Sequence, residues 1–313
     1  MYKKFFGLRD NPFNVNPDPR FLVLTKEIEE TLTGLMYGIQ TRKGFVTLTG
    51  EVGTGKTTII NRLLDWLHAQ RAHTAFIFNS RMNTNQLFDF ILSEFDIACS
   101  SNSKSHQLMR LNQWLLDRYR AGATVVLIID EAQNLTYPVL EEIRLLTNLE
   151  TSTEKLIQIV LSGQQELEHK LKLPQLRQLR QRIMLRFKTS PLTREQAQEY
   201  VLDRLKTAGA QELIFSTQAL NTIYLYSLGI PRVINLLCEH SLVNAFVEQQ
   251  RPIEAAIVEE VAREFELDQV EPIASSTDAR VDVDVYNSEA FLQNLGEALS
   301  RFRVGPSTRR REK

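Results

Sequence analysis

The feature that most constrains the fold of this chain is a glycine-rich segment, Gly-Glu-Val-Gly-Thr-Gly-Lys-Thr, at residues 50–57. It fits the pattern G-x-x-x-x-G-K-[ST] at every position, in which glycines allow several backbone N–H groups to turn toward phosphate oxygens. An apolar run at residues 45–49 precedes it, and apolar residues at helical spacing follow it from Ile59 to Leu67. A strand, a glycine-rich loop and a helix in this order begin a βαβ unit. The sequence therefore predicts a phosphate-binding loop.

Strand signals and helical periodicity alternate through the first 192 residues. The expected strands are residues 45–49, 74–79, 124–130, 156–161 and 184–189. Five strands that alternate with helices predict an α/β fold with a parallel sheet covered on both faces. Before the first strand, Pro12, Pro17 and Pro19 favour an extended arm over a helix in the first twenty residues.

The strand signal stops after Pro191, and only helical periodicity continues. Thr193 and Gln196 have the spacing of a capping box, and further helices are expected at residues 219–226, 233–246 and 253–265. We therefore divide the chain into an α/β domain with an N-terminal arm (1–192), a helical domain (193–267), an acidic linker (268–287), and an amphipathic helix with a basic tail (288–313).

The composition of the chain argues against two classes of protein, those that coat nucleic acid and those that span a membrane. The chain has 37 Lys and Arg against 38 Asp and Glu, for a net charge of −1. This balance argues against a protein that coats nucleic acid with a strongly basic surface. The longest aliphatic run, residues 125–129, is far too short for a membrane span. We expect a cytoplasmic protein whose membrane contact, if any, is confined to the membrane surface.

An acid pair follows the third expected strand. Asp130 and Glu131 come directly after the apolar run 125–129, and the carboxyl ends of parallel strands are where open α/β sheets bind ligands. With ATP and Mg²⁺ bound, Lys56 would neutralise the β- and γ-phosphates, and Thr57 and Asp130 would hold the metal ion. Glu131 would polarise the attacking water. The pair and the loop together predict a site that binds a nucleoside triphosphate and activates water to attack it.

Two groups of arginines have open interpretations. Arg177, Arg180, Arg182 and Arg186 lie before and within the last expected strand. One of them could contact the γ-phosphate of a nucleotide bound by a neighbouring subunit. The same spacing is also typical of a basic helix face or of a surface that contacts nucleic acid. Arg232 follows Gly-Ile-Pro at the start of a helix. It either reports the nucleotide state to the helical domain or pairs with a surface acid.

The chain resembles the AAA+ ATPases, and within them the ExeA/GspA type of bacterial secretion and envelope systems. The resemblance rests on the loop, the acid pair, the arginine-bearing segment and the Gly-Ile-Pro-Arg helix start. It also rests on the arm at residues 5–13 and 17–21, on residues 140–150, and on Gly163-Gln164, and it extends to about residue 267.

This resemblance implies roles for individual residues. The phosphate-binding set comprises Gly50, Glu51, Val52, Gly53, Thr54, Gly55, Lys56, Thr57 and Thr58. Asp130 and Glu131 correspond to the Walker B pair, and Gln164, or Ser162 beside it, to sensor 1. Arg182, with Arg180 as second choice, corresponds to the arginine finger that acts in trans, and Arg232 to sensor 2. Asn11 and Phe13 would line the adenine pocket, and residues 193–267 would form the helical lid.

The resemblance implies an oligomeric ATP-hydrolysing motor or switch that supports secretion, exopolysaccharide export or envelope-complex assembly at the inner membrane. Its expected partners are further copies of the chain and secretion or envelope-assembly proteins. The main alternative is an ATP-dependent DNA-binding regulator of transposition, similar to MuB and TniB, and another is a nucleotide-gated scaffold with little hydrolysis. Weak, non-specific DNA binding and peripheral membrane contact through residues 288–304 are further expectations.

Overall fold

The computed structural model describes residues 1–14, 19–21, 23–78, 81–101 and 103–267, which belong to one compact unit. The predicted linker at 268–287 and the predicted amphipathic helix and basic tail at 288–313 lie outside the described residues. Among the helices of the described part, none combines the length and apolar character that crossing a membrane requires.

Five parallel strands form one sheet in the order β2-β3-β4-β1-β5. The strands are β1 (Phe45–Gly50), β2 (His73–Ile77), β3 (Val125–Ile129), β4 (Gln158–Gly163) and β5 (Leu185–Thr189). β1 therefore lies between β4 and β5, and Thr49 is paired with Gly163 while Gly50 is paired with Thr189. The carboxyl ends of these three strands are level, so the residues that follow them meet at one edge of the sheet.

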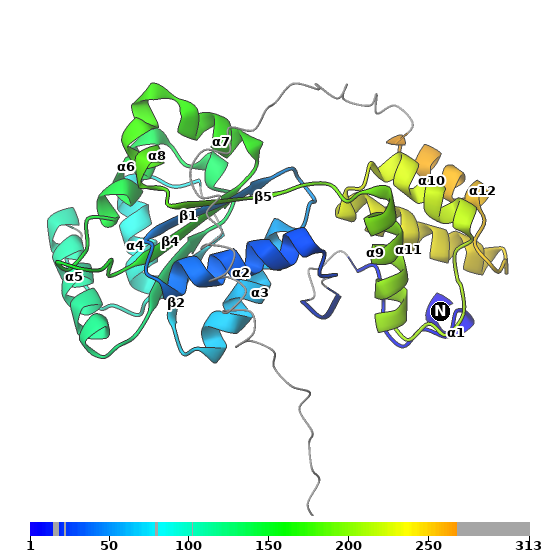
Figure 1. Cartoon of the computed structure of the whole chain (residues 1–313), viewed down its shortest axis with the longest axis horizontal. Coiled ribbons are helices and arrows are strands. Elements are labelled where there is room, and N and C mark those ends of the chain that lie inside the picture. Colours follow the sequence, from blue (N-terminus) through cyan, green and yellow to red (C-terminus); the bar gives the residue numbers. More distant parts are fainter. Residues whose placement is uncertain (15–18, 22, 79–80, 102, 268–313) are drawn as a thin grey trace, which may run out of the picture. The chain divides into compact units, whose positions relative to one another are not determined.

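Helices cover both faces of the sheet (Figure 1). On one face lie α2 (Lys26–Gln40) and α3 (Lys56–Ala69). On the other lie α4 (Thr84–Glu94), α5 (Lys104–Arg120), α6 (Tyr137–Leu146), α7 (Gln165–Lys172) and α8 (Arg177–Arg182). Val126 and Ile128 of β3 point into the first layer, and Val125, Leu127 and Ile129 into the second. Burial on both faces explains the uninterrupted apolar run of this strand.

The chain then continues only as helices. These are α9 (Arg194–Thr207), α10 (Thr217–Ser227), α11 (Pro231–Val247) and α12 (Ala255–Glu264), and they share one hydrophobic core. The predicted capping box at the start of α9 is present: the Gln196 N–H donates to Thr193 Oγ1, and the Thr193 N–H donates to Gln196 Oε1. The predicted fold, a five-stranded parallel α/β core followed by an all-helical part, is confirmed.

The prediction that the first twenty residues avoid a helix was wrong at their start. Residues Tyr2–Phe5 form a short helix, α1, and Pro19–Phe21 form a single 3₁₀ turn, η1. Proline restricts only its own position and the one before it, so the first proline, Pro12, does not oppose a helix at residues 2–5. The arm buries Phe6, Leu8, Phe13 and Phe21 in the same core as α9–α12. Its apolar side chains therefore pack with the helical part.

Candidate functional site

The glycine-rich loop joins the end of β1 to the first residue of α3, Lys56. Gly53 has φ +83°, in the left-handed region that glycine adopts at little cost. A Cβ on Gly53 would lie 2.8 Å from Arg232 Cβ, and one on Gly50 would lie 1.9 Å from Thr189 Oγ1. The loop therefore requires glycine for backbone conformation and for close packing against β5 and α11.

The Lys56 side chain is buried and folds back along the loop. Its ammonium donates to the carbonyl oxygens of Gly50 (2.9 Å) and Glu51 (2.8 Å). Burial lowers the pKa of Lys56, although the nearby carboxylates of Glu131 and Asp130 act in the opposite direction. A partly desolvated cation at the N-terminus of a helix is a favourable place for a bound anion, because both the charge and the helix dipole attract it.

The acid pair at the end of β3 faces this loop. Asp130 is buried, and its Oδ2 accepts a hydrogen bond from Thr57 Oγ1 at 3.3 Å. A hydroxyl and a carboxylate side by side next to the loop form the kind of oxygen donor set that Mg²⁺ prefers. The two residues predicted to hold the metal ion therefore lie together, and their chemistry fits it.

Glu131 lies beside two glutamines. Its Oε2 accepts hydrogen bonds from Gln164 Nε2 (3.2 Å) and from Gln133 Nε2 (2.5 Å). Ser162, the other predicted sensor 1 candidate, is fully buried, and its hydroxyl has no hydrogen-bond partner in the described part of the chain. Of the two candidates, only Gln164 contacts the acid pair and lines the cleft described next.

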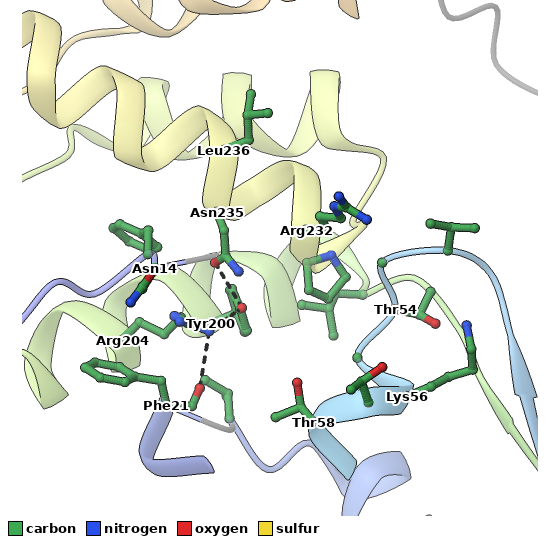
Figure 2. A pocket seen from close by; sticks show the side chains of 18 of the residues that line it. Asn14, Phe21, Thr54, Lys56, Thr58, Tyr200, Arg204, Arg232, Asn235 and Leu236 are labelled. Atoms are coloured by element: carbon green, nitrogen blue, oxygen red, sulfur yellow. Dashed lines mark hydrogen bonds between the residues drawn. The ribbon is translucent and has the colours of Figure 1, made fainter. Parts of the chain in front are cut away.

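A cleft of about 510 Å³ extends from the loop into the helical part (Figure 2). Most of the predicted site residues line it: Val52, Gly53, Thr54, Gly55, Lys56, Thr57, Thr58, Glu131, Gln164, Arg232 and Phe13. The loop and the helical part touch directly, since the Arg232 N–H donates to the Gly53 carbonyl at 3.2 Å. Residues distant in sequence are therefore gathered around one cavity.

Five predicted residues do not line the cleft: Gly50, Glu51, Asp130, Asn11 and Arg182. Gly50, Glu51 and Asp130 lie next to it, through the contacts with Lys56 and Thr57 described above. Asn11 donates through Nδ2 to Glu239 Oε1 at 3.2 Å, and its own Oδ1 accepts from the Phe13 N–H at 3.0 Å. Glu239 and Phe13 do line the cleft, so Asn11 supports the wall without forming it. Arg182 lies where the strands begin, at the opposite edge of the sheet from the loop.

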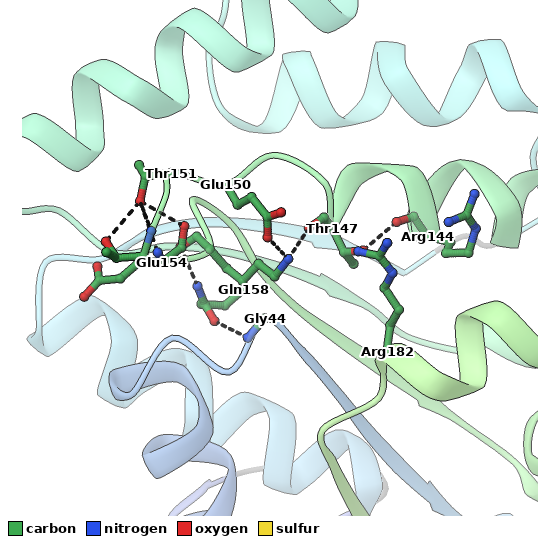
Figure 3. A network of polar contacts seen from close by, with 10 residues as sticks. Gly44, Arg144, Thr147, Glu150, Thr151, Glu154, Gln158 and Arg182 are labelled. Atoms are coloured by element: carbon green, nitrogen blue, oxygen red, sulfur yellow. Dashed lines mark hydrogen bonds and ion pairs between the residues drawn. The ribbon is translucent and has the colours of Figure 1, made fainter.

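Arg182 is part of a polar network at that opposite edge (Figure 3). Its Nη1 donates to Thr147 Oγ1 at 3.1 Å, and the Thr147 hydroxyl donates to the Arg144 carbonyl at 2.6 Å. The Thr147 carbonyl in turn accepts from Lys155 Nζ at 2.9 Å. Arg182 is therefore held in place, and it contributes nothing to the cleft of its own chain.

The far end of the cleft contains residues that sequence reasoning missed, namely Phe21, Tyr200, Arg204, Asn235 and Glu239. The buried Arg204 guanidinium donates to the Pro12 carbonyl (2.6 Å), the Tyr200 hydroxyl (2.6 Å) and the Phe21 carbonyl (3.4 Å). Tyr200 donates onward to Asn235 Oδ1 at 3.0 Å, and burial raises the pKa of its phenol. The sequence offered only the i, i+4 spacing of Tyr200 and Arg204 on one helix. This spacing indicates that the two side chains can contact each other, but it does not indicate a binding site.

Comparison with known proteins shows which families and folds the chain is similar to. Residues 39–171 match the family model described as an AAA domain. Over 254 residues, the chain is 43% identical to general secretion pathway protein A of Aeromonas hydrophila. The match includes 81% of this chain and 46% of that protein, so the chain spans about half the length of this relative.

Solved structures with the same fold include Cdc6p from Pyrobaculum aerophilum, with a TM-score of 0.64, 21% identity, and coverage of 82% of this chain and 71% of that one. The ORC2 protein of Aeropyrum pernix gives a TM-score of 0.61, 16% identity, and coverage of 83% and 72%. At these identities, the likeness concerns the fold alone. The predicted resemblance to AAA+ proteins of the ExeA/GspA type is confirmed: residues 39–171 match an AAA domain, and the chain is similar in sequence to general secretion pathway protein A.

Proposed function

We propose that this chain binds Mg·ATP in the cleft and hydrolyses it to ADP and phosphate. The observation that carries the proposal is that the glycine-rich loop, the Thr57 hydroxyl and the Glu131 carboxylate line one cavity, and that Thr57 is hydrogen-bonded to the carboxylate of Asp130. In support, the similar ORC2 protein was solved in ADPNP and ADP complexes.

Different residues of the chain have different roles in binding and hydrolysing ATP. The loop N–H groups and the N-terminus of α3 bind the phosphates, and Lys56 turns its ammonium from the loop carbonyls toward them. Thr57 and Asp130 hold the metal ion, which supplies neutralisation of phosphate charge when bound. Glu131 accepts a proton from the attacking water, and Gln164, which contacts it, orients that carboxylate. The arm residue Phe13 and the far end of the cleft enclose the base.

Oligomerisation completes the site in this proposal. Arg182 lies away from its own cleft and is half-exposed, so its guanidinium is available to a γ-phosphate bound by a neighbouring copy. Arg232 borders the loop from α11 and would transmit the nucleotide state to the helical part, which we propose is the lid.

The relationship to general secretion pathway protein A supports a role for this ATPase in protein secretion, on the cytoplasmic side of the inner membrane. The partners are then further copies of the chain and components of a secretion or envelope-assembly complex. The transposition-regulator alternative has no comparable support.

Two substitutions test the proposal. Glu131→Gln should still bind Mg·ATP but hydrolyse it roughly 10²–10⁴-fold more slowly, because an amide cannot accept the proton of the water. Lys56→Ala should abolish binding of a fluorescent ATP analogue. Near-normal turnover by Glu131→Gln would assign the base to another residue, and unchanged affinity in Lys56→Ala would contradict the assigned loop.

A mixing assay tests the trans arginine. Arg182→Ala and Lys56→Ala should each be inactive, because one lacks the guanidinium and the other cannot bind nucleotide. Mixed assemblies should regain part of the activity, since an intact Arg182 from the Lys56→Ala subunit meets a nucleotide bound by the Arg182→Ala subunit. Mixtures without recovered turnover would contradict the role of Arg182.

A further inference from the structure

The side chain of Gln133, two residues after Glu131, makes two hydrogen bonds that link the ends of β3 and β4. Its Nε2 donates to Glu131 Oε2 at 2.5 Å, and its Oε1 accepts from the Gln164 backbone N–H at 3.1 Å. Gln164 Nε2 completes the triangle by donating to the same Glu131 oxygen at 3.2 Å. The three residues form a closed cluster, which we call the Glu131–Gln133–Gln164 triad.

The partners determine the orientation of the Gln133 amide. A backbone N–H can only donate, so the atom that faces Gln164 N has to be the acceptor oxygen. The remaining amide group faces the Glu131 carboxylate, which accepts when ionised. A reversed amide would lose both bonds, so this side chain has one favourable orientation.

The surroundings hold the Gln133 backbone and leave little room for movement. The Gln133 carbonyl accepts from Lys170 Nζ at 2.5 Å, which ties the turn Ala132–Asn134 to α7. A Cβ at Gly163 would lie 2.9 Å from Gln133 Oε1, so glycine at the end of β4 makes space for the amide. Glu131 itself has φ +53°, an unfavourable backbone conformation for a residue with a side chain. The fold thus maintains a strained acid residue and a tightly seated amide next to each other.

We propose that Gln133 is a positioning residue for hydrolysis: it fixes the Glu131 carboxylate and couples it to Gln164 at the end of β4. This proposal rests on the proposed ATPase function. Displacement of a reacting group by about 1 Å can cost on the order of 10²-fold in rate, so the loss of one tether should reduce kcat strongly. Because Gln133 does not line the cleft, the KM for ATP should change little.

Three variants separate the two roles of the amide. Gln133→Ala removes both the donor to Glu131 and the acceptor for Gln164. Gln133→Glu keeps an acceptor oxygen for the Gln164 N–H but presents a carboxylate to Glu131. Gln113→Ala is the matched control, because Gln113 is an exposed glutamine on α5 whose amide donates to Asp117, away from the triad.

The experiment combines steady-state ATP hydrolysis with hydrogen–deuterium exchange of the nucleotide-free proteins. We expect Gln133→Ala to lower kcat by roughly 10–100-fold and to accelerate exchange at the Gln164 amide. Gln133→Glu should also lose turnover, yet retain slow exchange at Gln164. Gln113→Ala should match the parent in both measurements.

Parental kcat in Gln133→Ala or in Gln133→Glu would overturn the positioning role, as would unchanged exchange at Gln164 in Gln133→Ala. A rise in KM for ATP as large as the loss in kcat would also overturn it, because Gln133 would then act on nucleotide binding as well as on the chemical step. Failure of the parent protein to hydrolyse ATP would refute the proposed function, and this role with it.

Discussion

Arg204 attaches the N-terminal arm to the helical part, and its replacement by alanine should loosen both the fold and the cleft. The guanidinium makes short hydrogen bonds, each of 2.6 Å, to the Pro12 carbonyl and the Tyr200 hydroxyl. Hydrogen bonds to charged groups contribute about 1.5–3 kcal/mol each, so the two together amount to about 3–6 kcal/mol. The third bond, of 3.4 Å to the Phe21 carbonyl, is too long to add much.

Because the arm residues Phe13 and Phe21 line the cleft, the same change should weaken nucleotide binding. For a chain of this size, 1 kcal/mol corresponds to about 2–4 °C in Tm, so Arg204→Ala should lower Tm by roughly 10 °C. A loosened aromatic wall should reduce ATP affinity by about tenfold, or 1.4 kcal/mol. Differential scanning calorimetry and titration with a fluorescent ATP analogue measure the two effects.

Two comparison variants sharpen the test. Lys206→Ala, at an exposed position on the same helix, should change neither quantity. Arg204→Lys keeps the charge but not the planar fork of donors, so its effect should be intermediate. A loss of less than about 1 kcal/mol in Arg204→Ala would show that these bonds do not hold the arm. A large loss of stability with unchanged ATP affinity would show that the arm is not a wall of the nucleotide site.

Three further predictions concern the loop and the C-terminal residues. Gly53→Ala should weaken ATP binding because the added Cβ would meet Arg232. Gly122→Ala is the control and should leave ATP affinity unchanged, because Gly122 has a similar φ of +72° but open space around it. Equal ATP affinities of the two variants would contradict the packing argument. Burial lowers the pKa of Lys56, so Lys56 should lose its charge at a lower pH than a free lysine, whose pKa is ~10.4. In a pH series, ATP affinity should therefore begin to decline below that pH, and a decline only above it would contradict the prediction. Deletion of residues 285–313 should leave ATP binding intact while removing association with the export or assembly machinery in co-purification; lost ATP binding would instead make the segment part of the ATPase core.

Local chemistry explains why much of the site was predictable. The glycine-rich loop is recognisable because the φ of Gly53 and the close approach of Gly50 to Thr189 exclude other residues at those positions. The acid pair is recognisable because a strand buried on both faces ends abruptly in charge at Asp130. The capping box at Thr193 involves only residues three apart.

Local sequence patterns did not predict the short N-terminal helix. Pro12 correctly indicated a non-helical segment around Asn11, but the prolines carried no information about residues 2–5. There, Phe5 packs against Phe246, with ring centroids 5.6 Å apart. A contact between residues separated by most of the chain supports a helix that the local pattern does not indicate.

The sequence by itself thus determined the phosphate loop, the five strands, the acid pair and the helical part, because each depends on neighbours a few residues apart. Only the tertiary structure decided the strand order, the packing of the arm on α9–α12, the contact of Gln133 with Glu131 and Gln164, and the bonds of Arg204 to Pro12 and Tyr200. The physical reason is that a glutamine or an arginine has the same local preferences wherever it occurs. Its partner, and therefore its role, depends on the tertiary fold, which brings residues that are distant in sequence within hydrogen-bond distance.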